Sequence, residues 1–129
     1  MKFPTELKYT KTHEWAKKAG SKVLVGISDY AQKEISDVVF VELPKMGQSV
    51  VQGKAAAVVE SVKAAFDIYV PVSGKVTKVN SELESNPAKV NDDCYGDGWL
   101  FEIESSQSSD WDGLLSAENY EHHLKQESH

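Results

Sequence analysis

The chain has 129 residues, of which 40% are hydrophobic, and its 14 basic and 20 acidic residues give a formal net charge of −6. This composition suits one domain over residues 1–129 with a single core, and it excludes a disordered chain. The acidic balance argues against a nucleic-acid partner, because phosphate contacts need clustered Lys and Arg. No stretch approaches the roughly 20 apolar residues of a membrane span, so we expect no membrane partner.

The first predicted elements are a strand at 22–27 and a short helix directly after it. Asp29 is the expected N-cap of this helix, because Gln32 follows three residues later as in a capping box. The β-branched and aromatic run 38–43 predicts a strand that is buried on much of both faces. Pro44 ends this strand, and the residues after it supply a turn.

The rest of the chain continues with short strands and ends in a helix. Four more strands are predicted at 55–62, 66–70, 76–79 and 99–104. The tail predicts a helix over about 116–125, with Ala117, Tyr120 and Leu124 on one face. The predicted fold is therefore mainly β, in the α+β class. It consists of two packed antiparallel sheets that form a flattened barrel-sandwich, with short peripheral helices.

The segment 55–70 joins two strands of opposite direction with almost nothing between them. This arrangement predicts a tight hairpin with Lys63 at its tip. A lysine at a hairpin tip points into solvent, and the small side chains of Ala64 and Ala65 leave space behind it. Since most lysines in turns are plain surface charges, the surrounding motifs must decide what Lys63 does.

Those motifs follow one another along most of the chain. They are YTKTHEW at 9–15, GISDYAQ at 26–32, DVVFVELP at 37–44, VESVKAA at 59–65, DIY at 67–69, PVSG at 71–74, NDD at 91–93 and YGDGWL at 95–100. The hairpin resembles that of lipoyl- and biotinyl-carrier domains. Biotin carriers typically place Met beside the lysine, and lipoyl domains of 2-oxoacid dehydrogenases typically have Asp-Lys-Ala, whereas Lys63 lies in Val-Lys-Ala. From Tyr9 to about His122, the chain resembles the glycine cleavage H-protein family.

This resemblance implies a fold of the lipoyl-carrier type and a lipoate cofactor attached as an amide of Lys63. It also implies a carrier without a catalytic site. The carrier would take the aminomethyl group of glycine from a pyridoxal-phosphate-dependent glycine decarboxylase to an aminomethyltransferase, and dihydrolipoamide dehydrogenase would reoxidise it. A lipoate-attaching enzyme must reach Lys63 first, and we expect the carrier to be a monomer.

Glu14 and Asp67 are the candidates to hold the loaded arm, because its end carries a protonated amine that a carboxylate can bind. Glu14 belongs to the N-terminal motif, and Asp67 lies four residues past Lys63 on the return strand. We expect the site around Glu14 to be about half exposed. The alternative for each residue is an ordinary surface carboxylate.

The cysteine and the histidines give weaker indications of function. The single cysteine, Cys94, cannot form an internal disulfide or a zinc site of several cysteines, and no orienting group suggests a Cys–His nucleophile. No metal is expected. The histidines are expected at the surface, namely His13, His122, His123 and His129. Cys94 departs from the family pattern, where Pro is usual. Phe66 also departs from it, where a small residue is usual, and adds bulk three residues from Lys63.

The location and two alternative functions stay open at this point. The N-terminus has neither the apolar segment of a secretory signal nor the look of a transit peptide, so we expect a cytoplasmic, bacterial protein. The mature form of a mitochondrial protein is the alternative. The chain could also relay lipoate to other enzymes, or serve as an unmodified β-module. Intact mass would separate the unmodified module from the carriers, and reconstituted glycine decarboxylation would separate the two carriers.

Overall fold

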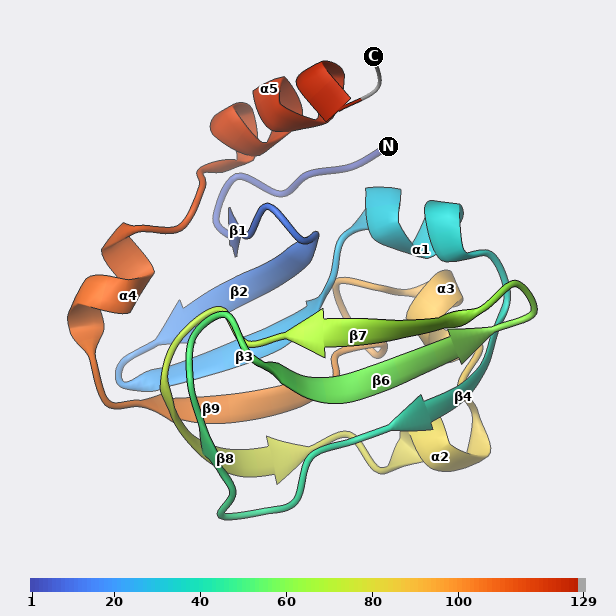
Figure 1. Ribbon diagram of the computed structural model, residues 1–129, viewed down its shortest axis with the longest axis horizontal. Coiled ribbons are helices and arrows are strands. Elements are labelled where there is room, and N and C mark those ends of the chain that lie inside the picture. The colour runs from blue at the N-terminus through green and yellow to red at the C-terminus, as the bar shows by residue number, and fades with distance from the viewer. Residues whose placement is uncertain (128–129) are drawn as a thin grey trace.

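The computed structural model describes residues 1–127, which contain nine strands and five helices (Figure 1). The strands are β1 (Lys8–Tyr9), β2 (Glu14–Ala19), β3 (Lys22–Ile27), β4 (Val38–Glu42), β5 (Ser49–Val50), β6 (Ala55–Ser61), β7 (Ala65–Tyr69), β8 (Gly74–Val79) and β9 (Phe101–Ser105). The helices are α1 (Asp29–Ile35), α2 (Glu82–Ser85), α3 (Lys89–Asp92), α4 (Ser108–Asp112) and α5 (Ala117–Glu127). None of these helices is long and apolar enough to cross a membrane.

The strands form two antiparallel sheets. The larger sheet has six strands in the order β1-β2-β3-β9-β8-β5, and the smaller has three in the order β4-β6-β7. Apolar side chains from both sheets share one buried core, to which β3 contributes Val25, β6 contributes Val59 and β9 contributes Phe101. The predicted fold of two packed antiparallel sheets with short helices is confirmed, although the sheets remain open and do not close into a barrel.

The strand predicted at 22–27 has the observed bounds of β3, and it pairs along its length with β2. In this register Trp15 faces Gly26, and a Cβ on Gly26 would lie 2.5 Å from a carbon of the Trp15 ring. Only glycine at position 26 therefore leaves room for the buried indole of Trp15. The sequence reasoning predicted no strand for β2, which brings Glu14 beside Ile27.

Two local predictions in the following segment are wrong. The N-cap of α1 is Ser28, whose side chain accepts a hydrogen bond from the backbone N–H of Ala31, whereas Asp29 lies inside the first turn. The strand β4 is not buried on both faces, because Val39 and Phe40 are 54% and 49% exposed. Their exposure follows from the position of β4 at the edge of the small sheet and from a bulge between Val38 and Phe40.

The C-terminal helix α5 packs over the N-terminal segment and β1, at the top of Figure 1. Its buried side chains are Ala117, Tyr120 and Leu124, which confirms the predicted face. Tyr120 stacks on Tyr9 with ring centroids 4.7 Å apart. This second apolar cluster, which includes Trp15, holds the segment before β2 in place, and that segment supplies part of the candidate site.

Candidate functional site

The hairpin of β6 and β7 places Lys63 at an exposed tip, as the sequence predicted. The tip is tight because the backbone N–H of Ser61 bonds the carbonyl of Ala64 at 2.9 Å, and the hydroxyl of Ser61 accepts the N–H of Lys63 at 3.1 Å. The backbone N–H of Val62 also bonds the carbonyl of Asp37, which anchors the tip to the start of β4. The backbone of Lys63 is thus fixed while its side chain lies in solvent.

A cleft of about 300 Å³ lies beside this tip, between α1, β7 and the start of β2. The residues that line it are Thr12, His13, Glu14, Ile27, Tyr30, Ala31, Glu34, Ile35, Phe66, Asp67 and Ile68. Glu34 also accepts, through its backbone carbonyl, a hydrogen bond from Nζ of Lys63 at 3.1 Å. Because one residue takes part in both, the amine of Lys63 lies next to this cleft, which we call the arm cleft.

Glu14 is only 1% exposed, so the expectation of a half-exposed site is wrong, and so is the alternative of an ordinary surface carboxylate. Its Oε1 accepts hydrogen bonds from the hydroxyls of Thr10 and Thr12, each at 2.5 Å. Its Oε2 accepts the backbone N–H of Tyr69 at 3.1 Å. Since a carboxylate offers about four acceptor positions, these three bonds leave one on Oε2.

Burial sets the electrostatics of this carboxyl. Loss of water raises the pKa of Glu14, and the hydrogen bonds from Thr10, Thr12 and Tyr69 only partly oppose that rise. A cation that binds at the remaining acceptor position stabilises the ionised form of such a buried carboxyl group. The arrangement is thus suited to a small protonated group that enters the cleft.

Asp67 is exposed and lies on β7 in the wall of the same cleft. Phe66, the neighbouring departure from the family pattern, also lines the cleft and packs partly against the core. The structure therefore brings Glu14 and Asp67 to one cleft and Lys63 to its side. These three residues are separated by up to 53 positions along the chain, from 14 to 67.

The sequence did not predict that His13 lines the cleft, because this residue was expected at the surface. His13 is half-buried and lines the cleft with a positive φ of 80°, which is uncommon outside glycine. Its Nδ1 lies 2.8 Å from the hydroxyl of Tyr120, and its ring lies 4.9 Å from that of Tyr30. Burial lowers the pKa of His13, against the opposing effect of Glu127. No sequence spacing could have shown a contact across 107 residues.

Among the described residues, His122, His123 and Cys94 do not form a reactive centre. His122 is exposed, His123 is half-buried with Nε2 3.1 Å from Glu127, and His129 lies outside the described residues. Within residues 1–127, no group of three or more His, Cys, Asp or Glu is arranged to hold a metal ion. Burial raises the pKa of the Cys94 thiol to about 12, so the thiol is not poised as a nucleophile.

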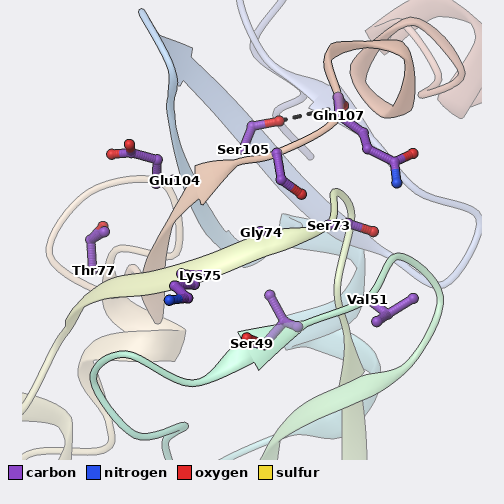
Figure 2. A pocket seen from close by; sticks show the side chains of 11 residues that line it. Ser49, Val51, Ser73, Gly74, Lys75, Thr77, Glu104, Ser105 and Gln107 are labelled. Atoms are coloured by element: carbon purple, nitrogen blue, oxygen red, sulfur yellow. Dashed lines mark hydrogen bonds between the residues drawn. The ribbon is translucent and has the colours of Figure 1, made fainter.

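A cavity larger than the arm cleft, with a volume of about 730 Å³, lies elsewhere, against β5, β8 and β9 (Figure 2). Its walls include Ser49, Lys75 and Glu104, and the hydroxyl of Ser105 bonds the carbonyl of Gln107. The chain reaches this cavity after β7 has run its full length away from the hairpin tip. It contains none of the predicted site residues, so size alone does not make it the candidate site.

Comparisons with known proteins all lead to one family. The family model described as "Glycine cleavage H-protein" matches residues 7–127. A glycine cleavage system H protein of Thermus thermophilus is 52% identical over 128 residues, which cover 99% of this chain and all of that protein. The H protein of Rubrobacter xylanophilus is 52% identical over 124 residues, 96% of each chain.

A solved structure gives the same answer for the fold. The crystal structure of a glycine cleavage system H protein from Mycobacterium marinum superposes with a TM-score of 0.88 at 33% identity. The match covers 95% of this chain and 99% of that one. By sequence and by structure, the chain belongs to the glycine cleavage H-protein family.

Proposed function

We propose that this chain is a lipoyl carrier with lipoate attached as an amide to Nζ of Lys63. Membership of the H-protein family supports the role. The observation that carries the site is the exposed amine of Lys63 at the tip of a tight hairpin, directly beside the arm cleft. An attaching enzyme can reach this amine without unfolding any part of the hairpin.

The residues around Lys63 fit an acylated lysine. Acylation leaves one N–H on Nζ, and that N–H can keep the bond to the carbonyl of Glu34. Ala64 and Ala65 are exposed and small, so the arm has room to leave the tip in more than one direction. When attached, the lipoyl group supplies the sulfur that accepts the aminomethyl group of glycine.

Glu14 and Asp67 hold the cargo in the cleft between transfers. The remaining acceptor position on Oε2 of Glu14 can bind the protonated amine of the cargo, and the exposed carboxylate of Asp67 adds a second negative group to the same wall. Glu14 itself faces almost no bulk water, because it is 1% exposed. A cation there and an ionised Glu14 stabilise each other.

The carrier works with three enzymes and supplies no catalytic centre itself. It receives the aminomethyl group at the pyridoxal-phosphate-dependent glycine decarboxylase and delivers it at the aminomethyltransferase. Dihydrolipoamide dehydrogenase then restores the disulfide. Tethering to Lys63 raises the effective concentration of the arm at each active site. Purified lipoylated protein without these enzymes should not decarboxylate glycine, and turnover by a clean preparation would contradict this division of labour.

Intact mass spectrometry after incubation with a lipoate-attaching enzyme tests the proposal. The parent protein should gain one lipoyl increment, and Lys63→Arg should gain none, because its guanidinium offers no amine to acylate. Lys54→Arg is the matched control, since Lys54 is also an exposed lysine of this hairpin, at the end opposite the tip. A lipoylated Lys63→Arg would disprove the site. An unmodified parent would favour a plain β-module, and modification without reconstituted glycine decarboxylation would favour a lipoate relay.

A further inference from the structure

Three large apolar side chains are exposed close to Lys63. Val39 is 54% exposed, Phe40 is 49% exposed and Val62 is 67% exposed. The backbone places them together, because Phe40 pairs with Glu60 near the end of β6 and the N–H of Val62 bonds the carbonyl two residues before Val39. We call Val39, Phe40 and Val62 the tip patch.

The exposure of the tip patch is built into the backbone. A regular edge strand would turn every second side chain toward the core, but the bulge after Val38 leaves both Val39 and Phe40 in solvent. Exposed apolar residues on an edge strand favour unwanted association, and folded proteins usually avoid them. The other large apolar side chains that are exposed in residues 1–127 are Met1, Met46 and Val51, none of which belongs to β4 or to the hairpin turn.

Negative charge surrounds the tip patch. The exposed carboxylates on the neighbouring elements belong to Glu34, Asp37, Glu42, Glu60 and Asp67. Within residues 33–42 and 60–67, the exposed cations are Lys33 and Lys63, and acylation removes the charge of Lys63. An apolar centre with an acidic rim matches a partner that has an apolar depression and a basic rim.

We propose that the tip patch is the docking surface for the enzyme that acylates Lys63. This inference rests on the proposed function. An enzyme that delivers an acyl group to Nζ must cover the surface around it, and a specific interface covers about 800 Å² on each partner, which reaches well past Lys63 itself. Buried aromatic and aliphatic anchors near the centre of such an interface carry most of the binding free energy.

The tip patch and the arm cleft lie on different strands of the small sheet. Val39 and Phe40 belong to β4, whereas Phe66 and Asp67, which line the cleft, belong to β7. These strands are the two edges of the sheet, with β6 between them. Phe40 and Val62 do not line the cleft, so variants at these two positions can weaken docking without changing its walls.

The test measures initial rates of lipoylation against carrier concentration, with a purified lipoate-attaching enzyme and intact mass as the readout. Phe40→Ser and Val62→Ser should each lower kcat/KM about tenfold, mainly through KM, because a central interface contact is lost. Raising the salt concentration should also lower kcat/KM for the parent, since the charged rims attract each other. Met46→Ser is the matched control, because Met46 is 64% exposed outside the patch, and its rates should equal those of the parent.

The outcomes separate this inference from the proposed function. Equal thermal midpoints for all variants would show that the losses are not due to unfolding. Parental kcat/KM for both Phe40→Ser and Val62→Ser would overturn the docking surface while the parent still gains its lipoyl increment. Loss of glycine decarboxylation without loss of lipoylation would instead assign the patch to a later enzyme and also overturn the proposal. A parent that gains no increment contradicts the proposed function itself.

Discussion

Lys63 and Glu14, at the two ends of the proposed arm path, lie in opposite surroundings. The side chain of Lys63 is exposed, and its amine bonds one backbone carbonyl at 3.1 Å. Glu14 is 1% exposed and accepts hydrogen bonds from Thr10, Thr12 and Tyr69. Lys63 is easy for another protein to reach and makes few contacts with its own fold. Glu14 is hydrogen-bonded to three other residues of the chain.

This difference fits the two tasks of a carrier. Attachment needs an amine that a second protein can reach, so few contacts should bind it to its own fold. Retention of a labile cargo needs groups that are fixed before the cargo arrives and that face little water. In the proposed function, attachment uses Lys63 on the turn of a hairpin, and retention uses Glu14 where β2, β7 and the loop before β2 meet.

The largest effect should come from Glu14→Ala. This change leaves the N–H of Tyr69 without its acceptor and removes the acceptor of Thr10 and Thr12, so we expect a loss of about 2–3 kcal/mol in the free energy of unfolding. Lys63→Ala is the control and should change it by less than about 0.5 kcal/mol. Urea unfolding at neutral pH measures both. Equal losses of stability for Glu14→Ala and Lys63→Ala would contradict the contrast between the two residues.

A smaller loss should follow Tyr120→Phe, which tests how α5 supports the Glu14 end. The hydroxyl of Tyr120 lies 2.7 Å from Oγ of Ser28 and 2.8 Å from Nδ1 of His13. Its removal should lower the free energy of unfolding by about 1–2 kcal/mol, because one buried and one partly buried hydrogen bond are lost while the ring stacking on Tyr9 stays. Urea unfolding again measures the loss. An unchanged value would mean that α5 supports the cleft through apolar packing alone.

The pH dependence of stability should distinguish the buried carboxyl from the exposed ones. The pKa of Glu14 is raised above its ordinary value of 4.5, so the folded state binds its proton more readily than the unfolded state does. The free energy of unfolding of the parent relative to Glu14→Gln should therefore rise as pH falls through the raised pKa, by at most about 1.4 kcal/mol per pH unit. This difference in free energy of unfolding should level off below pH 4.5, the ordinary pKa of the group. Denaturant unfolding between pH 4 and 8 gives both curves, and parallel curves would contradict the raised pKa.

The contrast between the two ends also explains what the sequence could predict. The exposed position of Lys63 at the hairpin tip was predicted because a tight turn between two strands is a local feature, and exposure follows from the turn itself. The face of α5 was likewise predicted, since the spacing of Tyr120 and Leu124 is local to one helix. The burial of Glu14 was not, because it depends on a bond to Tyr69, 55 residues away.

Other errors arose where two local signals competed or where a backbone irregularity decided the outcome. Ser28 and Asp29 are both good N-cap residues, and the structure uses Ser28. The run at 38–43 is apolar enough for a buried strand, but a bulge after Val38 exposes two of its side chains. The sequence carries no turn residue that would reveal this bulge. The bulge exposes Phe40, which belongs to the proposed docking surface.

A still smaller effect, a several-fold shortening of the lifetime of the loaded carrier in partner-free buffer, is expected for Glu14→Gln. The substitution keeps the size and one acceptor oxygen but removes the charge that binds the protonated cargo, so only part of a charge-assisted bond is lost. A several-fold change is below the tenfold that corresponds to about 1.4 kcal/mol. Intact mass followed over time measures the lifetime, and lipoylation of Lys63 should be unchanged.

Asp67→Asn is the matched comparison, since it removes a charge from the exposed wall of the same cleft. Its effect should be smaller than that of Glu14→Gln, because water and salt already screen an exposed carboxylate. If Glu14→Gln leaves the lifetime unchanged, Glu14 serves only to join the loop of Thr10 and Thr12 to β7, and the cargo is held elsewhere. If Asp67→Asn has the larger effect, the cation lies at the open side of the cleft, where the exposed carboxylate holds it.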